Sequence, residues 1–339
     1  MNNDPLRFKF YGVTLSVRCG HPEINSQIRN DFFHFLTGQD HEIPAAIQLE
    51  FFCEPQPLGR NPHAKRLWSS PRYSVHDADR ERWVDYNGQA LCRYDFSCET
   101  GTLWCPDPAL MHELAYLLIH SRVGEMLDKE GLHRVHALGF SYRGKAVLAL
   151  APMGGGKTTL GMELLRHPGV RIFSDDSPLA DSDGILSPLP LRFGVLPSEE
   201  SLRWVPNGLK RTFDRRRYGR KILVDYGYFK DKISTPRKVD MIFMLKKHDG
   251  IPRIRRLGSL RAFFALFTSL VVGHGIPQIR EYILRPDPLD MFLLARNGVD
   301  RLKTARSLLK HARCYRLRMG PDTGSNAREL LRFLVAANG

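Results

Sequence analysis

The sequence has no apolar run long enough to cross a membrane. Its longest such run, Ala262–Gly273, is well short of the roughly 18 residues that a membrane-spanning helix needs, and it contains Thr268 and Ser269. The first ten residues lack the apolar segment of a secretory signal. We therefore expect a cytoplasmic protein with no membrane partner.

Cysteine is sparse, and its spacing indicates no cross-links. The six cysteines include no CxxC pair, and Cys92, Cys98 and Cys105 are not spaced like the ligands of a structural zinc site. In a chain of this size without a signal peptide, such cysteines are typical of reduced thiols, which agrees with the cytoplasm.

Biased composition is also lacking. The 28 glycines and 22 prolines follow no period, and 42% of the 339 residues are apolar and 25% charged. These values exclude a collagen-like or largely disordered chain and leave room for about two globular domains. The net charge of +14, from 50 Lys and Arg against 36 Asp and Glu, favours anionic partners such as nucleotides, nucleic acids or acidic peptides.

The N-terminal third is rich in predicted strands. Alternating or β-branched patterns predict extended structure over Phe8–Arg18, Ala46–Cys53 and Trp83–Phe96, with a loop at Pro55–Pro71 and a short helix at Asp31–Leu36. An amphipathic helix follows over Leu110–Lys129, with Asp107 as its N-cap and Pro108 in its first turn.

The pattern changes from residue 135 onward. Strands at Val135–Phe140 and Ala146–Leu150, joined by a tight turn at Arg143-Gly144-Lys145, are followed by a glycine-rich loop, a helix at Lys157–Arg166 and a strand at Val170–Phe173. This order is typical of an α/β nucleotide-binding domain. Beyond a basic, turn-rich region at 197–238, we expect strands at 240–245 and 315–319 and helices at 260–272, 288–298, 300–310 and 326–337.

The strongest motif is Ala151–Leu160, which reads APMGGGKTTL. Gly156, Lys157 and Thr158 match the end of the phosphate-binding pattern G-x-x-x-x-G-K-[ST], while Ala151 replaces its first glycine. Such a loop turns its backbone amides around a phosphate, and the following helix presents its N-terminus to the same group. The alternative is an ordinary glycine-rich turn between a strand and a helix.

This motif assigns roles to individual side chains. Lys157 can reach the β- and γ-phosphate oxygens of ATP, and the Thr158 hydroxyl is suited to bind Mg²⁺. We expect the following residues to contact the nucleotide: Met153, Gly154, Gly155, Gly156, Lys157, Thr158 and Thr159.

Two adjacent carboxylates, Asp175 and Asp176, follow the predicted strand at 170–173. Ligands of α/β sheets bind at the carboxyl ends of the strands, so the pair is expected near the glycine-rich loop. One aspartate would hold Mg²⁺ and the other would accept a proton from an incoming hydroxyl. The alternative is a turn or a helix cap.

Together these residues resemble the catalytic domain of HPr kinase/phosphorylase and its relatives, P-loop protein kinases related to phosphoenolpyruvate carboxykinase. The shared pattern runs from His136 through the loop at 154–158 to Asp175 and Asp176. The resemblance implies an α/β P-loop kinase domain at residues 131–339. The strand-rich residues 1–130, whose first hundred residues share nothing with the family, would form an N-terminal β-rich α+β domain. The resemblance also implies ATP and Mg²⁺ as cofactors and a possible homo-oligomer.

The resemblance extends to the roles of single residues. Asp175 and Asp176 serve as base and metal ligand, in an order that the sequence leaves open, and we place Thr158 and Asp176 at the Mg²⁺. His136 would lie near the phosphates, or it is a packed strand histidine. Arg192 would lie near the transferred phosphate, or it is a surface arginine.

The implied activity is transfer of the γ-phosphate to a Ser or Thr hydroxyl of a peptide or small protein. Thr158-Thr159 stands where the HPr-phosphorylating enzymes commonly have Ser-Glu, so the chain looks more like relatives that modify ribosomally made precursor peptides. The N-terminal domain would then recognise the substrate or its leader. A small-molecule or carboxykinase-like phosphotransferase and a nucleotide-dependent binding switch remain the alternatives.

A basic stretch, Arg203–Lys221, has interleaved aromatic residues and one acid, Asp214. It is interpreted as a loop that covers ATP and substrate, a nucleic-acid patch, or a solvated loop without a role. We favour the first interpretation over nucleic acid and expect Lys221 to contact the nucleotide.

Overall fold

The computed structural model describes residues 4–38, 44–56, 63–196, 202–215, 219–224, 226–273, 282 and 287–337. The chain forms two compact units. Unit 1 comprises Met1–Glu130, Phe213–Arg220 and Pro277–Pro286, and unit 2 comprises Gly131–Thr212, Lys221–Ile276 and Asp287–Gly339. Within the described ranges, no helix has the length and apolar character needed to cross a membrane.

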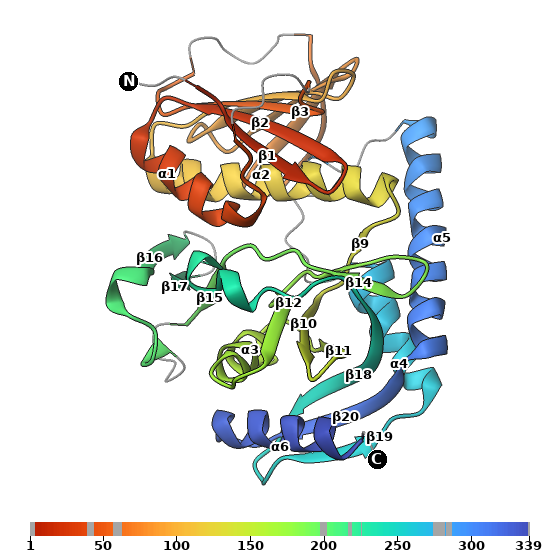
Figure 1. Ribbon diagram of the computed structural model, residues 1–339. Helices are drawn as coiled ribbons and strands as arrows, with labels where there is room; N and C mark the ends of the chain where they lie inside the picture. The colour runs from red at the N-terminus through yellow and green to blue at the C-terminus, as the bar shows by residue number, and fades with distance from the viewer. Residues whose placement is uncertain are drawn as a thin grey trace. The chain divides into compact units, whose positions relative to one another are not determined.

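Unit 1 is built on an eight-stranded sheet of order β1-β2-β3-β8-β7-β6-β5-β4 (Figure 1). Strands β2, β3 and β8 are parallel, and the remaining neighbours are antiparallel. The strands are β1 (Leu6–Phe10), β2 (Val13–Cys19), β3 (Ile47–Phe52), β4 (Lys65–Ser69), β5 (Ser74–Ala78), β6 (Glu81–Asp85), β7 (Leu91–Asp95) and β8 (Thr100–Trp104).

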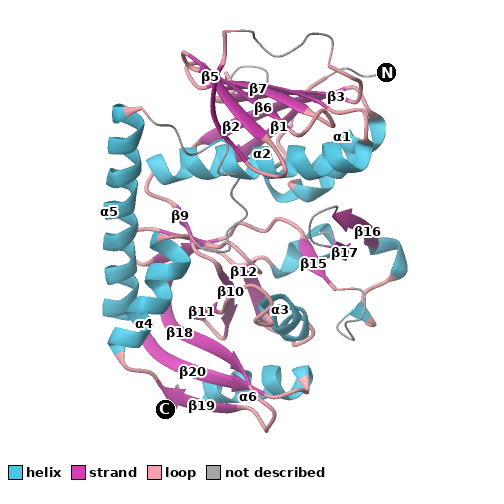
Figure 2. Ribbon diagram, turned by 180° about the vertical axis from the view of Figure 1, so that it is seen from behind, coloured by secondary structure: helices cyan, strands magenta, loops and turns pink. Residues whose placement is uncertain are grey.

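Helices α1 (Pro22–Asp31) and α2 (Pro108–Lys129) pack on each other in unit 1, and α2 also contacts β2, β3 and β8 (Figure 2). The predicted cap is confirmed, because Asp107 Oδ1 accepts hydrogen bonds from the amides of Ala109 and Leu110 at 2.9 and 3.3 Å. A capped first turn and a long buried face together explain why this helix was readable from sequence.

Other predictions for unit 1 were wrong in detail. Phe8–Arg18 is not one extended segment but a hairpin, in which β1 pairs antiparallel with β2. Tyr11 adopts a φ of 58° at the turn between them. The expected loop at Pro55–Pro71 contains β4, an exposed edge strand with no alternating apolar pattern. Around Asp31–Leu36 only the 3₁₀ turn η1 (Phe33–Phe35) forms, and the real helix, α1, lies before it.

Unit 2 has a mixed sheet whose main path runs β12-β10-β11-β18-β14-β13-β9, and β20 extends it beside β18 with β19 at its other edge. The strands are β9 (His133–Arg134), β10 (Ala137–Tyr142), β11 (Lys145–Leu150), β12 (Val170–Ser174), β13 (Leu179–Ala180), β14 (Ile185–Ser187), β18 (Arg237–Lys247), β19 (Arg253–Arg256) and β20 (Arg313–Met319). A small separate sheet has the order β15 (Phe193–Val195), β17 (Gly219–Val224), β16 (Lys210–Arg215).

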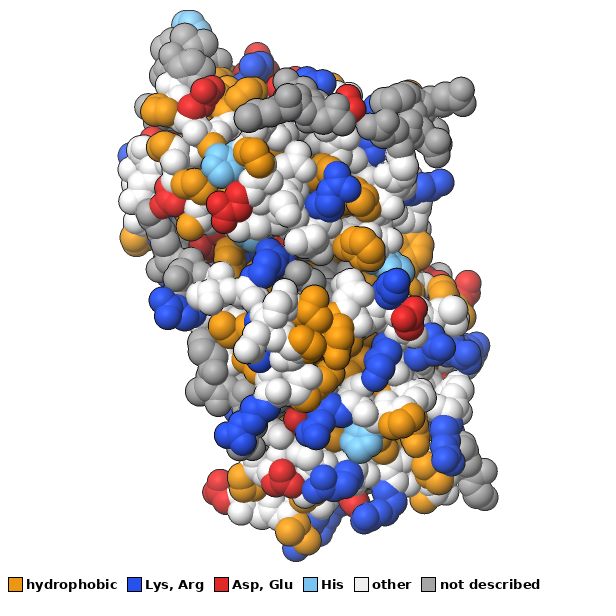
Figure 3. Space-filling view, turned by 60° about the vertical axis from the view of Figure 1, so that its left-hand side comes forward, with side chains coloured by type: hydrophobic (Ala, Val, Ile, Leu, Met, Phe, Trp, Pro, Cys, Tyr) orange, Lys and Arg blue, Asp and Glu red, His pale blue; other side chains and the backbone are white. Residues whose placement is uncertain are grey.

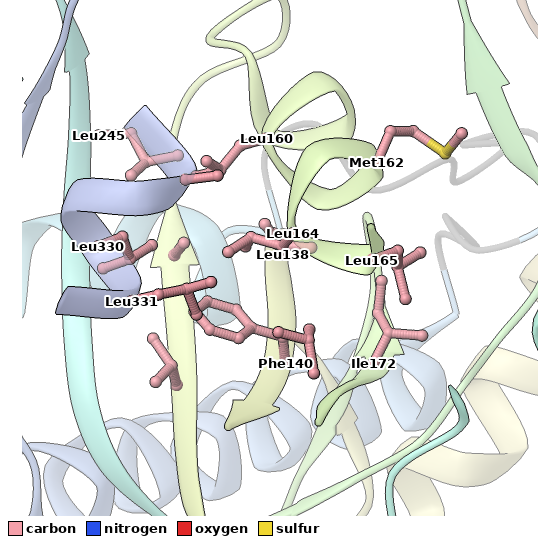
Figure 4. Packing of buried hydrophobic residues seen from close by; sticks show 14 of the residues in the cluster. Leu138, Phe140, Leu160, Met162, Leu164, Leu165, Ile172, Leu245, Leu330 and Leu331 are labelled. Carbon is pink, nitrogen blue, oxygen red and sulfur yellow. The ribbon is translucent and has the colours of Figure 1, made fainter. Parts of the chain in front are cut away.

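Helices cover both faces of this sheet. Alternate strand residues such as Phe140 and Phe243 pack against α3 (Lys157–Leu165) and α6 (Thr323–Ala336), as Figure 4 shows for part of this core. The intervening residues, such as Leu148 and Ile242, pack against α4 (Ser259–Leu266), the π-helical turn η5 (Phe267–Val271) and α5 (Pro288–His311). The result is a three-layer α/β arrangement, which is the coarse fold class expected from the sequence.

The order of elements in unit 2 follows the prediction, with local differences. The two helices expected at 288–298 and 300–310 are one continuous helix, α5, which includes Gly298. Among its described residues, the turn-rich region at 197–238 contains β16, β17 and the 3₁₀ segments η3 (Asn207–Leu209) and η4 (Tyr226–Lys232). The tight turn between β10 and β11 is confirmed, with Arg143 and Gly144 both at positive φ.

Candidate functional site

Strand direction brings distant residues to one edge of the unit 2 sheet. Strand β10 is antiparallel to both β11 and β12, so these two run in the same direction, and β18 and β20 are parallel to β11. Ala137, which opens β10, faces Leu150, which closes β11. His136, the glycine-rich loop and the Asp175–Asp176 pair therefore meet at the carboxyl edge, where ligands of α/β sheets bind.

The glycine-rich loop, residues 151–156, depends on its glycines in different ways. Gly154 and Gly156 lie in the left-handed region, at φ of 73° and 87°. A Cβ on Gly155 would lie 2.7 Å from the Cβ of Ala151 and 2.8 Å from the Pro152 oxygen. Gly156 is the N-cap of α3, so the first amides of the helix point out of the loop.

Ala151 fits the loop without strain. It is buried, and it is not among the non-glycine residues of the described chain that have a positive φ. Its methyl group fills the space that a side chain at residue 155 would need. Alanine can therefore stand at residue 151, where the motif has its first glycine, because Gly155 has no side chain that would meet the methyl group.

Lys157 is the first residue of α3, and its ammonium group is buried in a set of acceptors. Its Nζ donates to the carbonyl oxygens of Ala151 and Pro152, at 2.9 and 3.4 Å, and lies 2.8 Å from His136 Nε2. An ammonium group only donates, so Nε2 is the acceptor and the His136 proton is assigned to Nδ1. Burial lowers the pKa of Lys157, and the nearby Lys221 charge lowers it further, whereas Asp176 and Asp175 raise it.

His136 connects Lys157 to Asp176. Its Nδ1 lies 3.2 Å from Asp176 Oδ1, although the contact is poorly aligned for a hydrogen bond. The His136 amide donates to the Ser269 carbonyl at 2.9 Å, which fixes the backbone at this point. The histidine therefore lies between a cation and an anion, beside the loop, which is one of the two positions that the sequence left open.

The two aspartates face different partners. The Thr158 hydroxyl donates to Asp175 Oδ2 at 3.3 Å, and Asp175 is 5% exposed. Burial, followed by the Asp176 charge, raises the pKa of Asp175 to about 7. Burial alone would also raise the pKa of Asp176, but its contact with His136 and the charges of His136, Lys157 and Lys221 hold it below its usual value.

This split has a chemical meaning. At neutral pH Asp176 is ionised, and its side chain is 37% exposed, so it is open to an incoming group. Asp175 is buried and changes protonation near neutrality. Two neighbouring carboxylates whose environments move their pKa values apart are typical of sites that assign them different tasks.

Lys221 reaches this site from β17. A Cβ on Gly194, in the neighbouring strand β15, would lie 3.0 Å from Lys221 Cδ and 3.2 Å from its Nζ, so the lysine side chain lies directly over Gly194. Its charge lowers the pKa of Asp175, Asp176 and Lys157. Lys221 is therefore near the residues with which the sequence grouped it.

The remaining predicted residues are less closely tied to the site. Met153 is exposed at the loop, Thr159 is half-buried in the first turn of α3, and Arg192 is half-buried just before β15. Their roles toward a nucleotide stay predictions. Arg216, Arg217 and Tyr218 of the basic stretch lie outside the described residues. On the face that Figure 3 shows, Lys and Arg side chains (blue) lie among apolar (orange) and acidic (red) side chains.

The donors suit magnesium better than a metal held by protein alone. Within the described residues, no group of three or more His, Cys, Asp and Glu side chains is arranged to hold a metal ion. Mg²⁺ commonly uses one or two carboxylates, a hydroxyl, water and substrate phosphates, and the Thr158–Asp175 pair provides such oxygens. The sequence paired Thr158 with Asp176, whereas the contact in the structure is with Asp175.

The sequence reasoning missed Lys247 and Met319. A Cβ on Gly156 would lie 3.2 Å from Met319 Cε and 3.7 Å from Lys247 Cε, so both side chains touch the loop. The available signal was the pair Lys246-Lys247 directly after an apolar run. The expected strand ended at Leu245, two residues before β18 ends.

No protein-family model matches this chain, and no curated protein is significantly similar to it. Its function is therefore inferred from the chemistry of the residues described above.

Proposed function

We propose that this chain is a kinase that uses ATP and Mg²⁺ to phosphorylate a Ser or Thr hydroxyl of a peptide or small protein. The observation that carries the proposal is the grouping of Lys157, His136 and Asp176, with the Thr158–Asp175 pair beside it. This network lies at the N-terminus of α3, directly after a loop in which Gly154 and Gly156 adopt left-handed conformations. The resemblance to HPr kinase-like proteins implies a grouping of the same loop, histidine and aspartate pair, although with Asp176 rather than Asp175 beside Thr158 at the metal.

The loop and Lys157 would hold the phosphate tail of ATP. The amides of the loop and of the first turn of α3 are suited to phosphate oxygens, and the helix dipole adds to the attraction. Lys157 already donates to the carbonyl oxygens of Ala151 and Pro152. Exchange of these neutral acceptors for charged phosphate oxygens gives stronger, charge-assisted hydrogen bonds.

The Thr158 hydroxyl and the Asp175 carboxylate would hold Mg²⁺ together with the phosphates. The ion would supply neutralisation of the charge that develops on the transferred phosphoryl group. We assign this role to Asp175 because Thr158 contacts it and because it is buried.

Asp176 would serve as the base. The acceptor oxygen attacks the γ-phosphorus, the bond from this phosphorus to the oxygen bridging to the β-phosphate breaks, ADP leaves, and the acceptor's proton passes to an Asp176 oxygen. Asp176 suits this role because it is ionised and partly exposed. His136 would act as a positioning residue, which holds the carboxylate from its Nδ1 side while its Nε2 faces Lys157.

A transfer assay with γ-labelled ATP and a mixture of serine- and threonine-containing peptides tests the proposal. The purified protein should label peptide only when Mg²⁺ is present. Asp176→Asn should abolish transfer while nucleotide binding persists, and Asp183→Asn, which changes an exposed turn residue, should behave as wild type. Label confined to low-molecular-weight products would reject a peptide acceptor, and undiminished transfer by Asp176→Asn would reject the assigned base.

Unit 1 is proposed to recognise the peptide. It has its own buried core and lies apart in sequence from every residue of the network. Crosslinking of a phosphorylated peptide product, analysed by mass spectrometry on the full chain, should place the peptide on residues of 4–130. Crosslinks confined to unit 2 would contradict this assignment.

A further inference from the structure

The ends of β18 and β20 form a wall beside the glycine-rich loop. Lys247 and Met319 are the last residues of these parallel strands and are direct neighbours in the register. The His248 amide donates to the Met319 carbonyl at 2.9 Å, so the two strand ends are joined. Met319 Cε and Lys247 Cε both lie against Gly156, the N-cap of α3.

The pleat of β18 explains why Lys247 points to the loop. Side chains alternate between the two faces of a strand. Met241, Phe243 and Leu245 belong to the core beneath α3 and α6. Lys247 continues this series toward α3, whereas Lys246 belongs to the opposite series with Ile242, which faces α4 and α5. Lys246 and Lys247 are both exposed, and this alternation places their side chains on opposite faces of the sheet.

Positive charge gathers around Gly156. The N-terminus of α3 carries the positive end of the helix dipole, and Lys157 is its first residue. Lys221 is close enough to lower the pKa of Lys157. Lys247 adds a third ammonium group, with its Cε against the loop although its side chain is exposed. Asp175 and Asp176 offset only part of this charge, so the arrangement favours a ligand with several negative charges.

We infer that Lys247 is a further nucleotide-binding residue, which contacts the phosphate tail from the β18 side of the loop, with the buried Met319 side chain next to it. The inference rests on the proposed function and adds to it a preference among nucleotides. Lys157 and Lys247 would hold the tail from two sides of Gly156. The site would therefore select nucleoside di- and triphosphates over monophosphates.

Binding titrations of ATP, ADP and AMP by calorimetry test this inference on the full chain. Lys247→Met keeps the length of the side chain and removes the charge, so it separates charge from packing. We expect its Kd for ATP and ADP to rise about tenfold, a loss of about 1.4 kcal/mol, with little change for AMP. Lys247→Arg should recover most of the affinity. Lys246→Met is the matched control and should bind all three nucleotides as wild type.

The outcomes separate this inference from the proposed function. If wild type binds ATP, Lys157→Met weakens that binding, and Lys247→Met binds ATP as wild type, the inference is wrong and the proposed function stands. If Lys246→Met loses affinity as much as Lys247→Met, the effect is one of general charge and the inference is wrong. If wild type binds none of the three nucleotides, both are wrong.

Discussion

Both units contain a buried cation within a charged network, and the two cations are held by different kinds of partner. In unit 1 the Arg122 guanidinium, 1% exposed, donates to Glu99 at 2.7 and 2.9 Å, to Glu125, and to the Tyr282 carbonyl at 3.0 Å. It also lies over the ring of Tyr94, at 4.9 Å. In this network each charge has an opposite charge in direct contact.

In unit 2 the corresponding cation, Lys157, donates to two neutral carbonyl groups and faces a histidine. Asp175 accepts a hydrogen bond from a hydroxyl and has its pKa raised to about 7, first by burial. Lys157 is thus held by neutral acceptors, whereas Arg122 is held by carboxylates. A cation held by carboxylates holds a fold together, whereas a cation held by neutral acceptors is suited to bind charged groups from outside.

The largest expected effect is on the paired network. Arg122→Met should destabilise unit 1 by about 3–5 kcal/mol, because the partly buried carboxylates of Glu99 and Glu125 lose the buried guanidinium and keep only the more distant Lys129 ammonium as a cationic partner. Urea unfolding followed by tryptophan fluorescence measures this, since Trp68, Trp83 and Trp104 lie in unit 1. The double variant Arg122→Met with Glu99→Gln should recover part of the loss. An unchanged midpoint in Arg122→Met would show that the network contributes nothing to stability.

The corresponding substitution in unit 2, at Lys157, should lower the rate of phosphoryl transfer without lowering the stability of the fold. Lys157→Met should lower the phosphoryl-transfer rate by roughly 10²–10³-fold, the scale of losing one charged stabiliser of the transition state. Its unfolding midpoint without nucleotide should equal or exceed that of wild type, because burial of the ammonium is unfavourable. A loss of stability like that of Arg122→Met would mean that the two networks do the same structural work.

Asp175 should make unit 2 less stable as the pH rises. Its folded pKa of about 7 lies above the 3.8 that is ordinary for an aspartate, so the folded state binds more protons than the unfolded state between about pH 4 and 7. Stability is then lost across this window. Asp175→Asn removes the effect and should stabilise the metal-free protein by about 2–4 kcal/mol at pH 8, and by little at pH 4.

Hydrogen exchange of the α3 segment, measured at both pH values, checks this prediction. The control is Asp183→Asn, whose side chain is exposed in a turn. A stabilisation by Asp175→Asn that is equal at pH 4 and pH 8 would show that burial of the charge is not its cause.

The smallest effect is expected at the rim of the paired network. Lys129 lies 3.9 Å from Glu99 and 3.7 Å from Glu125, and its side chain is 36% exposed. Solvent screens such contacts, so Lys129→Ala should cost less than about 1 kcal/mol in the same urea experiment. A cost close to that of Arg122→Met would mean that the pairing extends to the surface.

Local sequence signals predicted the elements that carry the site. The Arg143-Gly144 turn, the apolar strands around it and the Lys157 helix are set by short-range patterns, and each is present. Edge strand β4 was missed because its residues are mostly exposed and carry no alternation. Helix α5 was divided in two because Gly298 and Val299 are poor helix formers, and packing of its buried face overrides them.

Lys247 could not have been found from local pattern. Its position beside Gly156 follows from the placement of β18 next to β11, which are almost 90 residues apart in sequence. The same holds for the choice between Asp175 and Asp176 as the neighbour of Thr158. Such assignments depend on strand order, which no short motif records.

A side chain at residue 155 would meet two obstacles, the Ala151 methyl group at 2.7 Å and the Pro152 carbonyl oxygen at 2.8 Å. Ala151→Gly would remove the first obstacle and leave the second, which belongs to the backbone. Gly155→Ala should therefore strain the loop in either background, with a smaller cost after Ala151→Gly. The need for glycine at residue 155 is thus imposed by the path of the main chain, whatever side chain stands at residue 151.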